Sequence, residues 1–240
     1  MRSQLYVSIS AQLALQRRLD TLANNIANVS TAGYRADEIS FEQIVSTSSP
    51  QPTSFVSRGN EHISLKSGEL VRTGNPLDIA VRGNSWLMVQ SGDTTAYTRD
   101  GRLTMSETGA LTNQLGEAVL DTSGSPIQLD PAAVSPTISA DGTIMQGTRR
   151  IATVGLFTMD PGAKLTRGPG AKIIPDIAAT PELDFNSNGI AQGFMEKSNV
   201  NPIHELTRLI AIQRTFEAVT TAIQESETAI QDAGRALSGA

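Results

Sequence analysis

The C-terminal stretch at residues 201–237, NPIHELTRLIAIQRTFEAVTTAIQESETAIQDAGRAL, decides how this chain folds. Its apolar residues recur at alternating steps of three and four, which is typical of a helix that packs along another helix. At about 1.5 Å per residue the predicted helix is roughly 55 Å long. Its partner must therefore come from the other end of the chain or from other molecules. The row is Leu209, Ile212, Phe216, Val219, Ile223, Ser226, Ile230, Ala233 and Leu237.

The N-terminal end carries a second row with the same spacing. No Pro or Gly interrupts it, and Gly33 is placed to take the left-handed conformation that often ends a helix. We expect the two rows to pack like a coiled coil, with the polar positions Ser8, Gln12 and Ser226 setting the register. The alternative is an ordinary pair of helices packed on a globular core. The N-terminal row is Leu5, Ser8, Gln12, Leu15, Leu19, Leu22, Ile26 and Val29.

We call the strongest apolar positions of both rows the helix seam. Each large apolar side chain left in water forfeits about 1.5–3 kcal/mol of stabilisation. We therefore expect the seam to carry assembly with other molecules, and the termini of a lone monomer to fray. The helix seam is Leu15, Leu19, Leu22, Ile26, Val29, Leu209, Ile212, Phe216, Val219, Ile223, Ile230 and Leu237.

The residues between the two predicted helices have a different pattern. Residues 34–60 are rich in Ser, Thr and Pro, which predicts an extended connector, in part strand. Residues 61–190 alternate in short apolar segments separated by Asp-Gly and similar turn pairs, which predicts an all-β, hairpin-rich domain. The longest single strand is expected at residues 151–159.

The predicted fold class is α+β, with long N- and C-terminal helices on either side of the β domain. The predicted division is an N-terminal helix at 1–33, the connector at 34–60, the β domain at 61–190, and a lead-in turn with the C-terminal helix at 191–240. Asn201-Pro202, followed by Glu205, favours a helix start at that point.

Composition excludes several function classes. The net charge is -5 with a pI of about 5.1, which argues against a dedicated nucleic-acid surface. There is no cysteine and there are only two histidines, so thiolate chemistry is impossible and histidine chemistry is sparse. No segment has the length and apolarity of a membrane span, and the N-terminus lacks the layout of a Sec signal.

Candidate chemical motifs are weak. Residues 184–189, DFNSNG, imitate the start of a calcium loop, but the required Glu position is Met195 and Glu196 misses by one, so a simple turn is favoured. Residues 167–172, RGPGAK, lack the spacing of a phosphate loop. A glycosylation triplet at 28–30 lies at a helix end, and no nucleophile motif is present. We therefore predict no catalytic, cofactor or metal site and no enzymatic activity.

Five motifs in order resemble the bacterial flagellar axial family of rod and hook proteins. The first is LANNIANVSTAGYR at 22–35. It is followed by GNPLDIAV at 74–81, YTRDG at 97–101, ISADGTI at 138–144, and QGFMEKSNVNPIHELTRLIAIQRTFE at 192–217. The resemblance covers nearly the whole chain. Its family-motif residues are Asn24, Asn25, Asn28, Gly33, Asn199 and Val200.

The resemblance implies a structural role. Its length fits a rod subunit better than a hook protein, and the opening at 10–20 is more similar to the proximal than to the distal type of rod subunit. The terminal helices are then expected to pack with copies of the chain and with other rod subunits in a periplasmic shaft that transmits torque. Export is expected through the flagellar type III apparatus. The Asn24, Asn25 and Asn28 amides are expected to cap carbonyls or bridge subunits, or else to be solvated.

Two other classes remain as alternatives. A ligand-binding β module with helical oligomerisation arms predicts an aromatic-lined pocket, although the chain has only one Trp and three Tyr. A secreted hydrolase would need a site assembled in space from residues that are distant in sequence.

Overall fold

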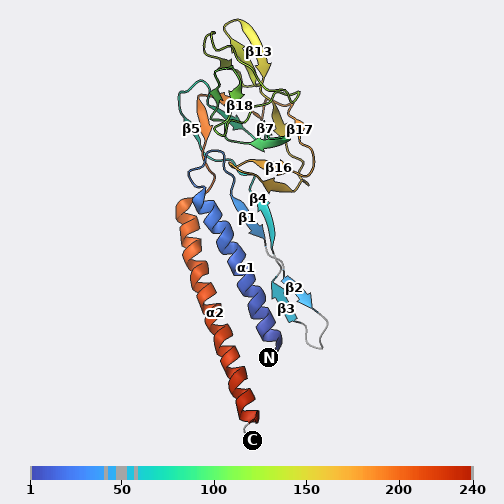
Figure 1. The fold of residues 1–240 in the computed structure, drawn as a ribbon, viewed down its shortest axis with the longest axis vertical. Helices are drawn as coiled ribbons and strands as arrows, with labels where there is room; N and C mark the ends of the chain where they lie inside the picture. The colour runs from blue at the N-terminus through green and yellow to red at the C-terminus, as the bar shows by residue number, and fades with distance from the viewer. Residues whose placement is uncertain (1, 41–42, 47–52, 57–58, 239–240) are drawn as a thin grey trace. The chain divides into compact units, whose positions relative to one another are not determined.

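The computed structural model describes residues 2–40, 43–46, 53–56 and 59–238. Two long helices, α1 (Arg2–Ala27) and α2 (Pro202–Ser238), form the two ends of the chain (Figure 1), and the strands come between them in sequence. This arrangement confirms the α+β class. The chain divides into two compact units, which we call the helical unit (Met1–Ala27, Asp37–His62 and Asn201–Ala240) and the β unit (Asn28–Ala36 and Ile63–Val200).

The helical unit is built on α1 and α2, which pack against each other and run antiparallel (Figure 1). Strands β1 (Asp37–Ser40) and β4 (Asn60–Ile63) pair with each other, and β2 (Gln43–Ser46) pairs antiparallel with β3 (Thr53–Val56). Both β1 and β3 contact α1. The segment 34–60, which we expected to be an extended connector that is in part strand, thus contains strands, and β1 and β3 pack on the first helix.

The start of α2 follows from its local sequence. Asn201 precedes the helix, and its side-chain oxygen accepts a hydrogen bond from the His204 backbone N–H at 3.1 Å. Pro202 takes the first helical position, where a missing N–H costs nothing. Glu205 lies in the first turn, where the helix dipole favours a negative charge, and forms an ion pair with Arg208 at 3.0 Å. The predicted helix start is confirmed.

The β unit contains a six-stranded antiparallel sheet and several shorter ladders. The strand order of the sheet is β15-β16-β8-β7-β14-β17, and a second sheet has the order β11-β12-β13. Two-stranded ladders join β9 to β10, β18 to β6 and β19 to β5. The last two ladders bring the segment before α2 onto strands from the start of the unit.

The strands of the β unit are short. They are β5 (Leu70–Arg72), β6 (Ile79–Arg82), β7 (Trp86–Ser91), β8 (Thr94–Thr98), β9 (Thr104–Met105), β10 (Leu111–Thr112), β11 (Thr137–Ile138), β12 (Thr143–Gln146), β13 (Arg149–Thr153), β14 (Leu156–Thr158), β15 (Leu165–Arg167), β16 (Ile173–Pro175), β17 (Thr180–Pro181), β18 (Gly189–Gln192) and β19 (Phe194–Glu196).

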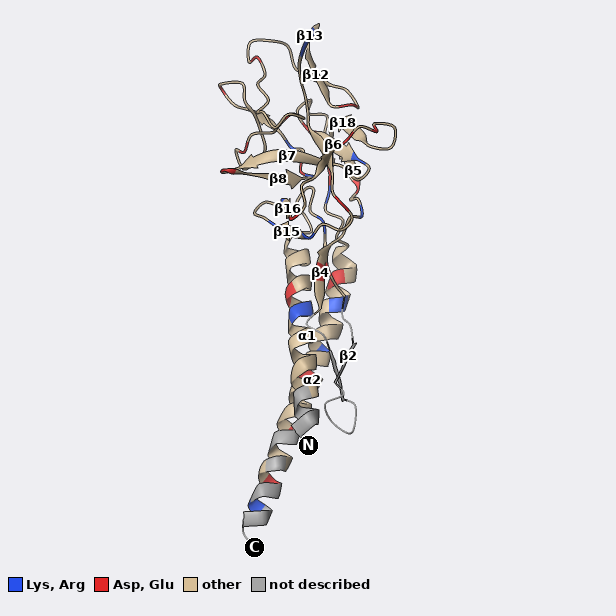
Figure 2. Cartoon of the chain, turned by 90° about the vertical axis from the view of Figure 1, so that its right-hand side faces the viewer, with Lys and Arg blue, Asp and Glu red and all other residues tan. Residues whose placement is uncertain are grey.

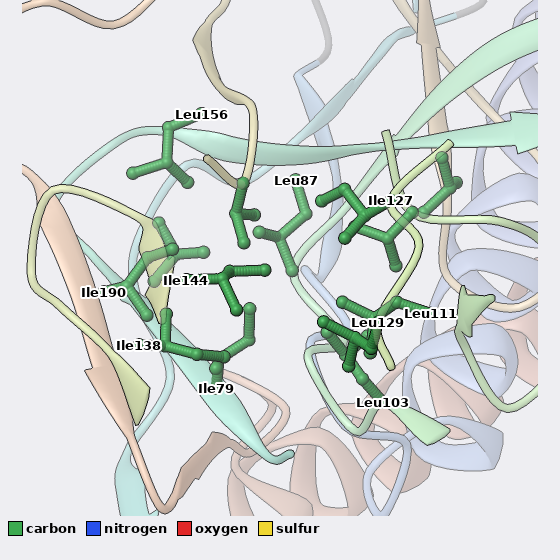
Figure 3. Close-up of a cluster of buried hydrophobic side chains, with 14 of the residues drawn as sticks. Ile79, Leu87, Leu103, Leu111, Ile127, Leu129, Ile138, Ile144, Leu156 and Ile190 are labelled. Carbon is green, nitrogen blue, oxygen red and sulfur yellow. The ribbon is translucent and has the colours of Figure 1, made fainter. Parts of the chain in front are cut away.

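Two apolar clusters form the core of the β unit. The larger contains aliphatic side chains that point toward one another from many strands and loops (Figure 3). The second contains the only Trp together with Tyr97 and Phe157, whose rings meet edge to face at 5.7 Å. Because the aromatic content is low, aliphatic packing fills most of this core. The larger cluster includes Ile79, Leu87, Leu103, Leu111, Ile127, Leu129, Ile138, Ile144, Leu156 and Ile190.

Three local expectations need correction. The strand expected at 151–159 is divided between β13 and β14, which belong to different sheets. The break falls at Val154 and Gly155, whose N–H groups donate to Gly142 and Leu120 instead of continuing one ladder. A Cβ at Gly155 would lie 2.7 Å from the Asp121 carbonyl oxygen, so only glycine fits this crossing.

The other two corrections concern the residues beside the helices. Helix α1 ends at Ala27, so Val29 lies outside it and packs with Tyr34, Ala171 and Val200 in the β unit. Before α2 the chain forms β18 and β19, where we expected only a turn. In both places hydrogen bonds to distant residues override the local pattern.

Candidate functional site

The members of the helix seam that lie on α1 and on the described part of α2 are buried or partly buried in the helical unit, whereas Val29 belongs to the β unit. Leu22 and Ile212 are buried. The side chains of Ile230 and Leu237 lie outside the described part. This burial supports a seam inside one chain, whereas a role of the same residues in assembly stays a prediction. The partly buried members are Leu15, Leu19, Ile26, Leu209, Phe216, Val219 and Ile223.

One of the polar seam positions makes a contact that bears on register. The Gln12 side-chain amide lies 3.5 Å from the Thr220 hydroxyl on the other helix. A polar pair across two helices favours one alignment over its neighbours, at some cost in stability. The contact supports the predicted role of Gln12, while the side chain of Ser226 is outside the described part.

Each helix also carries a second apolar row that is exposed. On α1 this row is Ile9 and Leu13, and on α2 it is Ile203, Leu206 and Ile210, which are 76%, 46% and 52% exposed. At 3.6 residues per turn these rows lie roughly 130° around the helix axis from the seam. Figure 2 shows only scattered charged residues along the described parts of both helices. We call these two sets the outer rows.

The asparagines of the first motif have different environments. Asn25 is buried, and its amide binds the Asp37 backbone twice, accepting from the N–H at 2.8 Å and donating to the carbonyl at 2.9 Å. The Asn28 side-chain oxygen accepts from the Thr31 hydroxyl at 3.1 Å within a turn. Asn24 is exposed. Asn25 thus holds strand β1 to the end of α1, as a capping amide would.

Gly33 has a positive φ of 66°, as expected, but for another reason. It lies beyond the end of α1, and its N–H donates to the Glu196 carbonyl at 2.8 Å. A Cβ at this position would lie 2.3 Å from the Asp100 backbone nitrogen. The glycine is therefore required by a close approach of two backbones, and not by the helix end.

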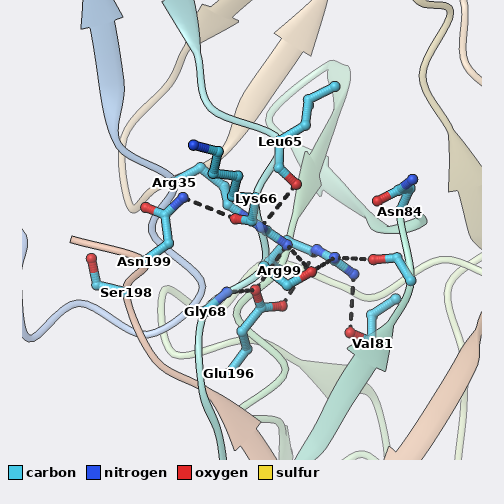
Figure 4. A network of polar contacts seen from close by, with 12 residues as sticks. Arg35, Leu65, Lys66, Gly68, Val81, Asn84, Arg99, Glu196, Ser198 and Asn199 are labelled. Atoms are coloured by element: carbon cyan, nitrogen blue, oxygen red, sulfur yellow. Dashed lines mark hydrogen bonds and ion pairs between the residues drawn. The ribbon is translucent and has the colours of Figure 1, made fainter. Parts of the chain in front are cut away.

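Arg35, Arg99 and Glu196 form a buried charged triad in the β unit (Figure 4). Glu196 Oε1 lies 2.8 Å from Arg35 Nη2 and accepts the Gly68 N–H at 2.8 Å, while its Oε2 lies 3.4 Å from Arg99 Nε. All three side chains are at most 1% exposed. The three come from three of the sequence motifs, so the fold brings distant motif residues to one place.

Backbone carbonyls and an aromatic ring complete the surroundings of the two guanidinium groups. Arg99 donates to the carbonyls of Val81 at 3.1 Å and Ser85 at 2.7 Å, and to that of Gly83. Arg35 donates to the Leu65 carbonyl at 3.1 Å. The ring of Trp86 lies 5.7 Å from the Arg35 guanidinium carbon and 5.5 Å from that of Arg99, within the range of cation–π attraction.

Electrostatics inside the triad are unbalanced, since two cations share one carboxylate. Burial lowers the pKa of Arg99 to about 10, with Glu196 opposing the shift and Arg35 adding to it. Burial also lowers the pKa of Arg35, against the attraction of Glu196. Among the residues that the structure describes, Glu196 is the carboxylate that forms ion pairs with both desolvated arginines.

Asn199 and Val200 of the last motif dock beside the triad. The Asn199 side-chain oxygen accepts from the Ala36 N–H at 2.7 Å, its amide donates to the Lys66 carbonyl at 2.9 Å, and its N–H donates to the Tyr34 carbonyl at 3.2 Å. Val200 packs with Tyr34 in a small apolar cluster. These two motif residues therefore have a structural explanation inside the β unit.

The glycine-rich segment RGPGAK contributes to the same place. Arg167 donates from Nη2 to the Arg35 carbonyl at 2.6 Å, and its guanidinium lies 4.3 Å from the centre of the Tyr34 ring. Ala171, with a φ of 60°, packs on Tyr34 and Val200. The segment RGPGAK, which does not fit a phosphate loop, thus binds and packs against Tyr34 and Arg35, which follow α1 in the chain.

Sequence reasoning missed the triad itself. Arg35, Arg99 and Glu196 each lie in one of the five motifs, but the sequence by itself assigns a role to none of them, and Glu196 is weighed individually only as a misplaced calcium ligand. Their approach depends on ladders between strands that are far apart in sequence. No cluster of three or more His, Asp or Glu suited to a metal ion occurs among the described residues. Within the same part of the chain, no helix is long and apolar enough to cross a membrane.

Comparison with known proteins assigns this architecture to a class. Three family models match in chain order: "Flagella basal body rod protein" at residues 5–35, "Flagellar hook protein FlgE/F/G D1 domain" at 80–146 and "Flagellar basal body rod FlgEFG protein C-terminal" at 191–235. These segments contain the first helix, part of the β unit and the second helix. The fold and the five motifs in chain order therefore define an axial protein of the bacterial flagellum.

Full-length relatives narrow the class. The chain is 42% identical to the flagellar basal-body rod protein FlgF of Mesorhizobium japonicum, over 99% of this chain and 98% of that protein. It is also 42% identical to FlgF of Rhizobium meliloti, over 100% and 99%, and 29% identical to FlgG of Bacillus subtilis, over 97% and 98%. The chain belongs to the flagellar basal-body rod protein family and is FlgF-like, a structural subunit of the rod.

Proposed function

We propose that the chain assembles through its helical unit with copies of itself and with other rod subunits, forming a periplasmic shaft that transmits torque for motility. The observation that carries this proposal is the division of apolar rows on α1 and α2. The seam is used inside one chain, and the outer rows are still exposed. Exposed rows of large apolar residues on a helix are typical of surfaces that bind another helix.

The unequal lengths of the helices support the same proposal. Helix α1 has 26 residues and α2 has 37. Because they run antiparallel, the last turns of α2 extend past the start of α1 (Figure 1). The seam spacing nevertheless continues through Ile230 and Leu237. A seam that continues beyond its partner inside the chain favours a partner from another subunit.

The remaining parts of the proposal rest on the family. We propose that the subunit has no catalytic activity, that it needs no cofactor, and that it leaves the cell through the flagellar type III export apparatus. Its partners are then proximal and distal rod proteins in addition to copies of itself. The ligand-binding alternative gains no support, because the aromatic side chains Trp86, Tyr97 and Phe157 are buried in the core.

The test replaces the outer row of α2 by charge. We expect Leu206→Asp with Ile210→Asp to abolish swimming when the variant replaces the natural gene, because two carboxylates would be buried between subunits. The purified variant is expected to keep its helical circular dichroism, since both side chains are exposed in the single chain.

The matched control adds the same two charges at Thr207 and Ala211, which are also exposed but lie off the row. This control is expected to swim. Normal swimming of the Leu206→Asp, Ile210→Asp variant, or equal loss in both variants, would show that the outer row is not the contact surface.

A further inference from the structure

The β unit brings together two chain segments that lie at its opposite ends in the sequence. Residues 28–36 follow directly from α1, and residues 194–200 lead directly into α2. Inside the unit they are bound by three backbone-level contacts: Gly33 N–H to the Glu196 carbonyl, Asn199 N–H to the Tyr34 carbonyl, and Ala36 N–H to the Asn199 side chain. Each segment therefore supplies hydrogen-bond partners that the other needs.

The charged triad adds an obligatory element to this pairing. Arg35 comes from the first segment and Glu196 from the second, and both side chains are fully buried. If the second segment leaves, Arg35 and Arg99 remain as buried cations without a carboxylate. If the first leaves, its arginine leaves with it, together with the Gly33 and Ala36 donors. A buried ion whose partner is removed is strongly destabilised.

The apolar clusters of the unit depend much less on these segments. The two main clusters are drawn from residues between Ile63 and Ile190. Only the small cluster of Tyr34, Ala171 and Val200 draws on the two segments. The two segments are therefore held largely by hydrogen bonds and ion pairs, whereas the rest of the unit has its own apolar core.

We propose that the Arg35–Glu196–Arg99 triad is a closure latch, which makes residues 28–36 and 194–200 dock and undock as one element while the remaining β unit stays folded. Such a sub-global opening is the behaviour of a cooperative segment whose stability is lower than that of the core. Each of the two segments connects the β unit to one helix through the chain, and both depend on the Glu196 carboxylate. Displacement of one segment is therefore expected to destabilise the docking of the other.

Hydrogen exchange of backbone amides on the full-length purified chain tests the latch, with peptides resolved by mass spectrometry. The Glu196→Gln variant keeps the shape of the side chain and removes its charge. We expect exchange at 28–36 to accelerate by at least about tenfold, although the substitution is in the other segment. Residues 111–129 supply Leu111, Val119, Ile127 and Leu129 to the larger apolar cluster. Exchange in this range is expected to change by less than about twofold.

A second variant keeps the test decisive even if Glu196→Gln unfolds more of the β unit than the two segments. Asn199→Ala removes the acceptor for the Ala36 N–H and the donor to the Lys66 carbonyl, but leaves the triad charges in place. We expect this variant to accelerate exchange by a similar factor in the two segments, and by a smaller factor than Glu196→Gln does. Arg35→Met, a substitution in the first segment, is expected to accelerate exchange at residues 194–200.

The control is Glu182→Gln, which removes a carboxylate bound by Ser85, Thr158 and Asn188 elsewhere in the unit. It is expected to leave the ratio of exchange between 28–36 and 111–129 as in the parent chain. The proposal is overturned if exchange accelerates only in the substituted segment, or if residues 111–129 accelerate as much as the two segments in Asn199→Ala.

Discussion

At the scale of single residues, the sequence motifs of this chain are explained by contacts inside the β unit. Gly33, Arg35 and Asn199 each meet a particular neighbour: a backbone that leaves no room for a Cβ, a buried carboxylate, and the Ala36 N–H, which donates to Asn199. Motif residues of this kind stabilise one subunit. They need not touch another subunit to be essential to the fold.

Gly33→Ala is predicted to destabilise the β unit by more than about 2 kcal/mol. It adds the cost of a positive φ, about 1 kcal/mol, to a Cβ that would lie 2.3 Å from the Asp100 nitrogen. Gly74→Ala is the control, because Gly74 also has a positive φ, of 78°, but nothing lies within 4 Å of its Cβ position. Urea unfolding followed by the fluorescence of Trp86 measures both, and an equal cost in the two variants would contradict the prediction.

At the scale of elements, the two helices use their faces differently. The described seam side chains of α1 and α2 are buried or partly buried, and the outer rows stay in contact with water. The split of residues 151–159 into β13 and β14 shows the opposite case, in which a continuous apolar run does not form a continuous strand. The difference arises because helix hydrogen bonds are internal to the segment, whereas strand hydrogen bonds depend on which neighbours the fold supplies.

Ile212→Ala is predicted to destabilise the helical unit by about 2–4 kcal/mol, because a buried seam side chain leaves a cavity. Ile203→Ala, on the outer row of the same helix, is predicted to change stability by less than about 0.5 kcal/mol. Thermal unfolding followed by circular dichroism at a helical wavelength distinguishes the two. Equal midpoints for the two variants would argue against a seam within the chain.

At the scale of the whole molecule, the chain combines a helical unit built around an apolar seam with a β unit that contains many buried or partly buried polar contacts. Lys172 pairs with Glu117 at a buried site, and Glu182 accepts hydrogen bonds from three side chains. The stability that these charged contacts contribute to the β unit depends on the ionisation of Glu117 and Glu182. The two units are therefore expected to respond differently to pH.

The β unit is predicted to lose stability below about pH 4.5. Burial raises the pKa of Glu117 and of Glu182, but hydrogen bonds from Lys172, Asn113 and Ser91 to the first, and from Thr158, Ser85 and nearby N–H groups to the second, outweigh it and leave each pKa below the ordinary value of 4.5. The unfolded chain then binds more protons than the folded one, so this stability is present above pH 4.5 and lost as the pH falls through the folded values.

Urea midpoints from the fluorescence of Trp86 at pH 7, 5, 4 and 3 measure this loss. A Glu182→Gln variant is expected to start lower at pH 7, by on the order of 1 kcal/mol for the lost charged hydrogen bonds, and to show a shallower fall. Glu107→Gln at an exposed position is the control. A midpoint that is independent of pH between 5 and 3 would contradict the assignment.

Much of the fold could be predicted from local pattern. The start of α2 at Asn201-Pro202 and the turn at Asp141-Gly142 follow from the conformations that these residues allow. Part of the site was also predictable, since Asn25, Gly33 and Asn199 stand in recognisable motifs. The triad was not, because Glu196 meets Arg35 only through strand pairing across most of the chain.

The sequence by itself determined the two helices, their seam and the membership of the rod family, because helical periodicity and motif order are properties of residues near one another in the chain. Only the tertiary structure decided where α1 stops, which residues surround Glu196, and which apolar rows stay exposed. These features depend on contacts between distant segments, and the free energy of such contacts is set by burial and geometry that no local pattern contains.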